Sequence, residues 1–162
     1  MASADATQRV MDLARVDLHP PHRAPAWWRV ALATIDSIVL SLVADRIVVA
    51  VFNHVFPTTR GYEHFHFGDY GKLTIVGIVI AGLAWPVVAR LSSAPRWLFF
   101  RLAILVTAVL LLPDLFIWHQ GQPIDAVGGL MCMHVAIGVI TYLVLVHLAP
   151  VRLRRGRQAE PA

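Results

Sequence analysis

Cysteine and charged residues are both scarce in this sequence of 162 residues. The single cysteine, Cys132, excludes an intramolecular disulfide and any CxxC zinc or redox site. Charged residues make up 15% of the chain and apolar residues 57%, whereas a typical soluble domain carries about 25% charged residues. Because a surface with so few charges would be poorly soluble, the composition indicates a membrane protein.

Recognisable catalytic motifs are also lacking. The sequence contains no P-loop, GxSxG, HExxH or dinucleotide-binding fingerprint. No cofactor is expected, because single histidines on separate helices do not form a haem site without a paired ligand at equal depth. Residues 1–28 hold no apolar core of a signal peptide, so we expect a cytoplasmic tail that is mobile up to about residue 25. Residues 8–18 of this tail could form a short amphipathic helix.

Four long apolar runs are present, and they predict an all-α membrane protein. Each is long enough to cross a hydrocarbon core of about 30 Å as a helix, and none alternates as barrel strands do. Short connections join the second run to the third and the third to the fourth, which predicts a four-transmembrane-helix antiparallel bundle over residues 29–150. The predicted spans are 30–51, 73–91, 97–118 and 124–148.

Lysine and arginine are distributed unevenly around these runs. Four lie before the first run, three around the second connection and four in the C-terminal tail, against two in the first connection and none in the third. The positive-inside rule therefore predicts a multi-pass plasma-membrane protein with both termini cytoplasmic. The basic tail at 151–162 is expected to contact anionic lipid headgroups. Nucleic acid is not an expected partner, because no aromatic platform accompanies the arginines.

Ionisable residues occur inside the predicted spans, where they need a partner or a purpose. Arg46 and Asp114 are expected at the same depth, and we predict that they pair directly or through water. The favoured interpretation of the whole set is a clamp between helices, and the alternative is a path for protons or a polar ligand. Asp36 has only His134, or a partner protein, as a possible contact. The predicted intramembrane polar cluster comprises Asp36, Asp45, Arg46, Asp114 and His134.

Helical spacing predicts which faces of the runs meet. Ser37, Ser41 and Asp45 follow one another at intervals of four residues and form one polar stripe. On the third run Ala103, Thr107 and Asp114 share a face, and on the fourth run His134, Gly138 and Thr141 share another. Small residues predict close approach of the helices: Gly77, Ala81 and Gly82 on the second run, and Gly128, Gly129 and Gly138 on the fourth.

The segment YEHFHFGDY at residues 62–70 concentrates histidines and carboxylates in the one long connection. In an extended segment His64 and His66 point to one side, with Phe65 and Phe67 on the other. Two such histidines with Glu63, Asp69 or His54 could hold zinc or copper. We favour an amphipathic interfacial loop whose aromatic rings enter the headgroup region, with no metal bound.

The region from Trp85 to Pro150 resembles a family of small, functionally uncharacterised actinobacterial membrane proteins with four helices. The resemblance is carried by Pro113-Asp114, by the turn Gly121-Gln122-Pro123 and by Met133-His134. It implies a fold and a location but no reaction, and it carries no metal site onto His64 or His66.

Three hypotheses about function remain open at the level of sequence. We favour a non-enzymatic accessory or interaction subunit of the cell envelope, associated with a protein partner or with further copies of itself. The first alternative is a small proton-linked transporter or channel-like oligomer. The second is a membrane enzyme with a metal bound at the long connection.

Overall fold

The structure is a computed structural model that describes residues 15, 17, 20 and 22–153. Four long helices dominate the described chain: α2 (Trp27–Val55), α3 (Phe67–Leu91), α4 (Pro95–His119) and α5 (Ile124–Leu148). Between α2 and α3 lie two 3-10 turns, η1 (Pro57–Thr59) and η2 (Glu63–Phe65). Most of the helix expected at 8–18 and the arginines at 154–157 lie outside the described residues.

Three of these helices have the length and composition of membrane spans. They are α3, α4 and α5, each of 25 residues, which is about 37 Å of helix against a hydrocarbon core of about 30 Å. The prediction of membrane helices is therefore confirmed for these three. The helix α2, which carries Asp36, Asp45 and Arg46 within its length, is not among them.

Three helices are longer than the sequence predicted, α4 (Pro95–His119 against 97–118) by three residues and α2 and α3 by more. The first apolar run was expected at 30–51, but α2 extends from Trp27 to Val55. The second was expected from residue 73, but α3 begins at Phe67 and includes Asp69 and Tyr70. The chain reverses between residues 56 and 66, through η1 and η2, so the polar residues on either side continue the two helices.

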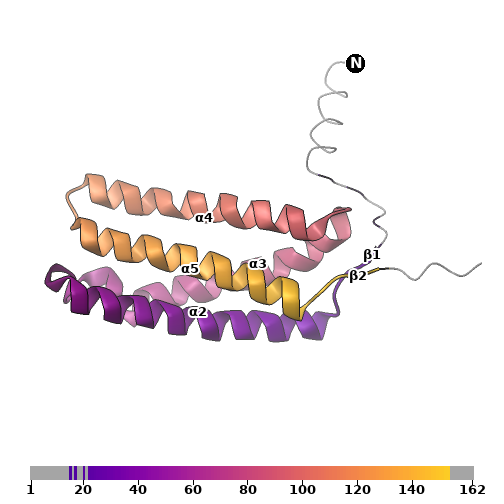
Figure 1. Cartoon of the computed structure of the whole chain (residues 1–162), viewed down its shortest axis with the longest axis horizontal. Helices are drawn as coiled ribbons and strands as arrows, with labels where there is room; N and C mark the ends of the chain where they lie inside the picture. The colour runs from indigo at the N-terminus through magenta and orange to yellow at the C-terminus, as the bar shows by residue number, and fades with distance from the viewer. Residues whose placement is uncertain (1–14, 16, 18–19, 21, 154–162) are drawn as a thin grey trace, which may run out of the picture.

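The helices lie side by side along the long axis of the molecule (Figure 1). α5 is central, with α2 along one side and α4 along the other, and α3 lies behind them, packed on α2.

Two clusters of buried side chains fill opposite ends of the helix bundle. The Trp85 core contains Ala33, Trp85, Val88, Phe99, Leu145, Val146 and Ala149. The Phe65 core contains Val49, Phe65, Tyr70, Leu130 and Met133.

The buried face of α2 follows the spacing predicted for its polar stripe. Ser37, Ser41 and Asp45 are all fully buried. Ala33 and Val49 extend the same stripe at intervals of four residues. The predicted stripe is therefore confirmed as the face of α2 that packs on the other helices.

Glycines mark three close approaches between helices. A Cβ atom at Gly82 would collide with the side chain of Thr34, and one at Gly138 would collide with Thr107. At Gly129 it would lie 2.6 Å from the ring of Phe65. Gly77, in contrast, has open space beside it. On α3 the close contact is therefore made by Gly82, and the expected role of Gly77 in packing within the bundle is wrong, whereas its alternative role in oligomer formation stays a prediction.

A two-stranded antiparallel ribbon joins the two ends of the described chain. β1 (His22–Arg23) pairs with β2 (Arg152–Leu153) beside the Trp85 core (Figure 1). The buried His22 ring donates from Nε2 to the carbonyl oxygen of Ala89 at 2.8 Å, and the amide of Ser93 donates to the carbonyl oxygen of Arg15 at 3.1 Å. The expectation of a mobile tail is therefore wrong for these residues, because their polar groups are bonded to the end of α3.

Candidate functional site

The histidine-rich segment does not adopt the extended form that the alternation of its residues predicted. Residues Glu63 to Phe65 form the 3-10 turn η2, and Phe67 opens α3. This geometry turns Phe65 inward, where its ring is 6% exposed and packs in the Phe65 core, while Phe67 is 57% exposed. Tyr70 is also buried. The idea that Phe65 and Tyr70 enter the headgroup region is therefore wrong, because both pack inside the molecule.

A layer of polar side chains lies beside the buried rings of Phe65 and Tyr70, and each of the four long helices contributes one residue to it. On α2 and α3, the hydroxyl of Thr74 donates to Oδ2 of the buried Asp45 at 3.0 Å. On α4 and α5, Oδ2 of Asp114 lies 3.0 Å from Nδ1 of His134. Both pairs lie next to the Phe65 core, since Val49 follows Asp45 by four residues and Met133 immediately precedes His134. We call these four residues the polar layer.

The hydrogen on the His134 ring can be assigned from its neighbours. Nδ1 lies 3.0 Å from the carbonyl oxygen of Leu130 and 3.0 Å from the Asp114 carboxylate. A carbonyl oxygen only accepts, so Nδ1 carries a hydrogen. The Leu130 contact has hydrogen-bond geometry, whereas Asp114 Oδ2 approaches outside it. The contact with Asp114 is therefore a close electrostatic one rather than an aligned hydrogen bond.

The ion pair predicted between Arg46 and Asp114 is not formed. Asp114 approaches His134 instead, and Arg46 is exposed on α2. The physical reason is rotation about the helix axis, since one residue turns the side chain by about 100°. Asp45 faces the interior, so Arg46 points away from it. Asp36 is exposed as well, and it does not meet His134.

The candidate metal ligands of the segment do not converge. His64, His66, Glu63 and Asp69 are all exposed. In the part of the chain that the structure describes, no group of three or more His, Cys, Asp or Glu side chains is placed to hold a metal ion. The hypothesis of a metal enzyme gains no support from this arrangement.

Several buried oxygen atoms near the polar layer lack a hydrogen-bond partner within the described chain. Oδ1 of Asp45 and the hydroxyls of Tyr62 and Tyr70 are among them, with Ser41 and Thr141 on the facing helices. Burial, with Asp114 and Glu63 nearby, raises the pKa of the Tyr62 hydroxyl above its ordinary value of 10.0. Tyr62 therefore stays protonated and can donate a hydrogen bond at physiological pH.

Three side chains in or beside the polar layer were not predicted to lie there, because Thr74 was not singled out and the rings of Tyr62 and Tyr70 were expected in the headgroup region. Thr74, Tyr62 and Tyr70 are uncharged, and hydroxyl-bearing residues are common in membrane helices. One signal was available, because Tyr70, Thr74, Ile78 and Gly82 recur every four residues on α3, and all four are buried. That spacing resembles the stripe on α2 and could have paired Asp45 with Thr74.

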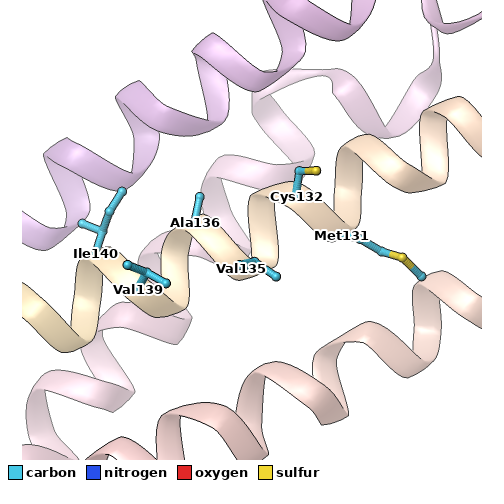
Figure 2. A pocket seen from close by; sticks show the side chains of 6 residues that line it. All are labelled: Met131, Cys132, Val135, Ala136, Val139 and Ile140. Carbon is cyan, nitrogen blue, oxygen red and sulfur yellow. The ribbon is translucent and has the colours of Figure 1, made fainter.

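The surface beside α5 has a different character. Figure 2 shows α5 between α2 and α4, with the side chains that line an open apolar depression. The lining residues are Met131, Cys132, Val135, Ala136, Val139 and Ile140. None carries a charged or hydrogen-bonding oxygen or nitrogen in its side chain. The depression therefore offers a packing surface rather than a reactive group.

Comparison with known proteins adds no relative to this description. No protein-family model, curated protein or solved structure matches the chain. The resemblance to the actinobacterial four-helix family therefore stays a prediction, and the functional proposal rests on the residues and their geometry.

Proposed function

We propose that the chain is a multi-pass plasma-membrane protein in which α2 is a fourth span, completing an antiparallel bundle. α2 packs against the other helices over its whole length. Thr34 meets Gly82 near its beginning, Asp45 accepts from Thr74 in its middle, and Phe52 meets Gly129 near its end. Because α2 is held in this way beside α3 and α5, it crosses the same membrane as these two helices.

The orientation follows from the arginines. Arg29, Arg90, Arg96 and Arg152 lie at or near the helix ends around the Trp85 core. By the positive-inside rule this end is cytoplasmic, as are both termini, and the segment with His64 and His66 faces outward. The basic C-terminal tail then contacts anionic lipid headgroups.

Within this frame we propose that the protein is a non-enzymatic accessory or interaction subunit of the cell envelope. The observation that carries the proposal is the inward pairing of the polar layer. Asp45 with Thr74 and Asp114 with His134 each join two helices, as expected for clamps that fix the arrangement of spans. The depression on α5 is lined by apolar side chains, which suits contact with another apolar surface.

Native co-purification tests this function. The full-length protein is isolated from its source membrane in mild detergent, and the proteins that accompany it stoichiometrically are identified. We expect a reproducible protein partner or further copies of the chain. A protein that is always a single copy with no companion contradicts the accessory role.

A second candidate is a small proton-linked transporter or channel-like oligomer. The observation in its favour is the set of buried oxygens without partners around Asp45, Tyr62 and Tyr70, because such groups can bind and pass protons. Proton flux into liposomes that contain the purified protein separates the two functions. A flux that Asp45→Asn abolishes while the fold stays intact supports the transporter, and no flux above empty liposomes supports the accessory role.

A further inference from the structure

Several charged side chains lie on the exposed surface of the proposed spans, where an unpaired charge is costly, and two of them have opposite signs and lie towards the same end of the bundle. Asp36 on α2 and Arg101 on α4 are both exposed, and neither makes an ion pair within the described chain. Arg101 lies over the ring of Trp97 at 3.9 Å from its centroid. The short side chain of Asp36 cannot reach the membrane surface as a long arginine can. A positive partner for Asp36 is therefore expected from outside the chain.

The two charges lie at nearly equal depth in the bundle. Ala33 on α2 and Phe99 on α4 belong to the same Trp85 core, and both helices begin at that end. Asp36 is three residues beyond Ala33, and Arg101 is two residues beyond Phe99. At about 1.5 Å per residue, the two positions lie about 4.5 Å and about 3 Å further along their helices.

The two charges also project from the same face of the molecule. Thr34 contacts α3 at Gly82, and the ring of Phe99 contacts α3 at Trp85, with centroids 4.9 Å apart. Asp36 and Arg101 each follow these α3-facing residues by two positions, which is a rotation of about 160° away from α3. Phe99 also stacks on Tyr142 of α5, but Arg101 lies about 120° around α4 from Thr107, which faces α5 at Gly138. Both charges therefore point away from α3, and we place them on the side of the molecule opposite α3, where α2, α5 and α4 lie side by side in Figure 1.

We infer that this face binds a second copy of the chain about a two-fold axis along the membrane normal. The inference rests on the proposal that α2 is a span. Such an axis through α5 places α2 of each copy opposite α4 of the other, as an isologous contact requires. Asp36 of one copy then meets Arg101 of the other, and the pair forms twice.

Other charges of a second copy fit less well. Arg46 is ten residues beyond Asp36 on α2, about 15 Å further along the helix. Two copies with the same topology keep the same depth, so Arg46 cannot reach Asp36. Arg101 is the exposed basic residue at the matching depth within the described spans.

The remainder of this face is apolar, as an interface within a membrane requires. Leu40 and Val43 follow Asp36 on α2 at four and seven residues, and Ile104 and Ala108 follow Arg101 on α4 at three and seven. All four are exposed. Between them lies the apolar depression on α5 (Figure 2), which would face its own copy across the axis.

Charge exchange within the full-length protein tests the interface. Subunit number is counted by single-molecule photobleaching in liposomes for the wild type, Asp36→Arg, Arg101→Asp and the double variant. We expect two copies for the wild type, a loss of dimer affinity of about tenfold or more in each single variant, and recovery in the double variant. Asp69→Arg, an exposed carboxylate outside this face, serves as the matched control and stays dimeric.

Two milder substitutions and a measurement of thermal stability distinguish loss of the dimer from loss of the fold. Asp36→Asn and Arg101→Gln should also weaken the dimer, and their thermal unfolding in detergent should match that of the wild type. Single variants that remain dimeric, a double variant that stays monomeric, or a wild type seen only as single copies or bound to a different protein all contradict the interface. In the same liposomes, labelling of cysteines at positions 23 and 64 from opposite sides, in a Cys132→Ala background, tests the span proposal separately, so the two failures are distinguishable.

Discussion

At the scale of single residues, the contact between Asp114 and His134 shows how an ionisable group is accommodated inside the bundle. Asp114 is almost fully buried and lies 3.0 Å from the imidazole, whose Nδ1 hydrogen also faces a carbonyl oxygen. Removing one partner leaves the other buried without compensation, which costs more than the pair contributes while intact. The two residues therefore act as a unit.

We predict that Asp114→Asn and His134→Gln each lower the free energy of unfolding by about 1–2 kcal/mol, because each breaks the contact between α4 and α5. The double variant should lose less than the sum of the two single losses, since the same contact is broken in both. Unfolding in mixed micelles with increasing denaturing detergent measures these differences. His66→Gln, at an exposed histidine, is the control and should change little, and strictly additive losses would contradict the pairing.

A second residue-scale prediction concerns the two phenylalanines of YEHFHFGDY. Phe65→Ala should destabilise the protein by about 3 kcal/mol or more, because its ring fills the core against Gly129. Phe67→Ala should cost less than about 1 kcal/mol, since Phe67 is exposed and its ring meets Tyr70 only edge-to-face. Thermal unfolding in detergent compares the two variants. Equal losses would mean that Phe65 is not a core residue.

At the scale of helices, close approach depends on glycine at particular positions rather than on the number of glycines. On α3, Gly82 lies against Thr34 of α2, while Gly77, five residues earlier, has open space beside it. A side chain at the first position must push α2 away, and a side chain at the second meets nothing in the chain.

We therefore predict that Gly82→Val separates α2 from α3 and lowers the free energy of unfolding by about 2 kcal/mol. Gly77→Val is the matched control on the same helix and should be neutral or slightly stabilising. The measurement is thermal unfolding together with cross-linking between cysteines placed on α2 and α3. A larger loss for Gly77→Val than for Gly82→Val would overturn this packing.

The helix scale also shows what the sequence could predict. Apolar runs of sufficient length predicted α3, α4 and α5 as membrane helices, and spacing of four residues predicted the buried stripe of Ser37, Ser41 and Asp45. Both patterns lie within one helix, where geometry is fixed. The spacing also placed Thr107 with Asp114 and Gly138 with His134, and these faces do meet.

Contacts between helices were harder to predict, because they depend on the rotation of each helix about its own axis as well as on the depth of each residue in the membrane. Arg46 and Asp114 were matched by depth, but Arg46 is turned outward beside the inward-facing Asp45. Likewise, alternation in YEHFHFGDY was interpreted as an extended segment, whereas two 3-10 turns reverse the chain there and bury Phe65. Thr74 was missed because an uncharged residue gave no reason to look for a partner.

At the scale of the whole molecule, each of the two cores packs one end of the bundle. The Trp85 core holds the ends of the described chain together, since the indole of Trp85 donates to the carbonyl oxygen of Ala149 at 2.8 Å and β1 pairs with β2 beside it. The Phe65 core covers the polar layer at the other end. The proposed orientation makes the first end cytoplasmic and the second external.

The central claim is that α2 crosses the membrane with the other three helices, and cysteine labelling tests it most directly. In a Cys132→Ala background, one variant carries His64→Cys and another carries Arg23→Cys, so that α2 is the long helix between the two positions. Intact cells are treated with a membrane-impermeant maleimide. We predict that position 64 is labelled from outside, whereas position 23 is labelled only after the cells are opened. Labelling of both positions from the same side would contradict the claim, because α2, which lies between them, would then not cross the membrane.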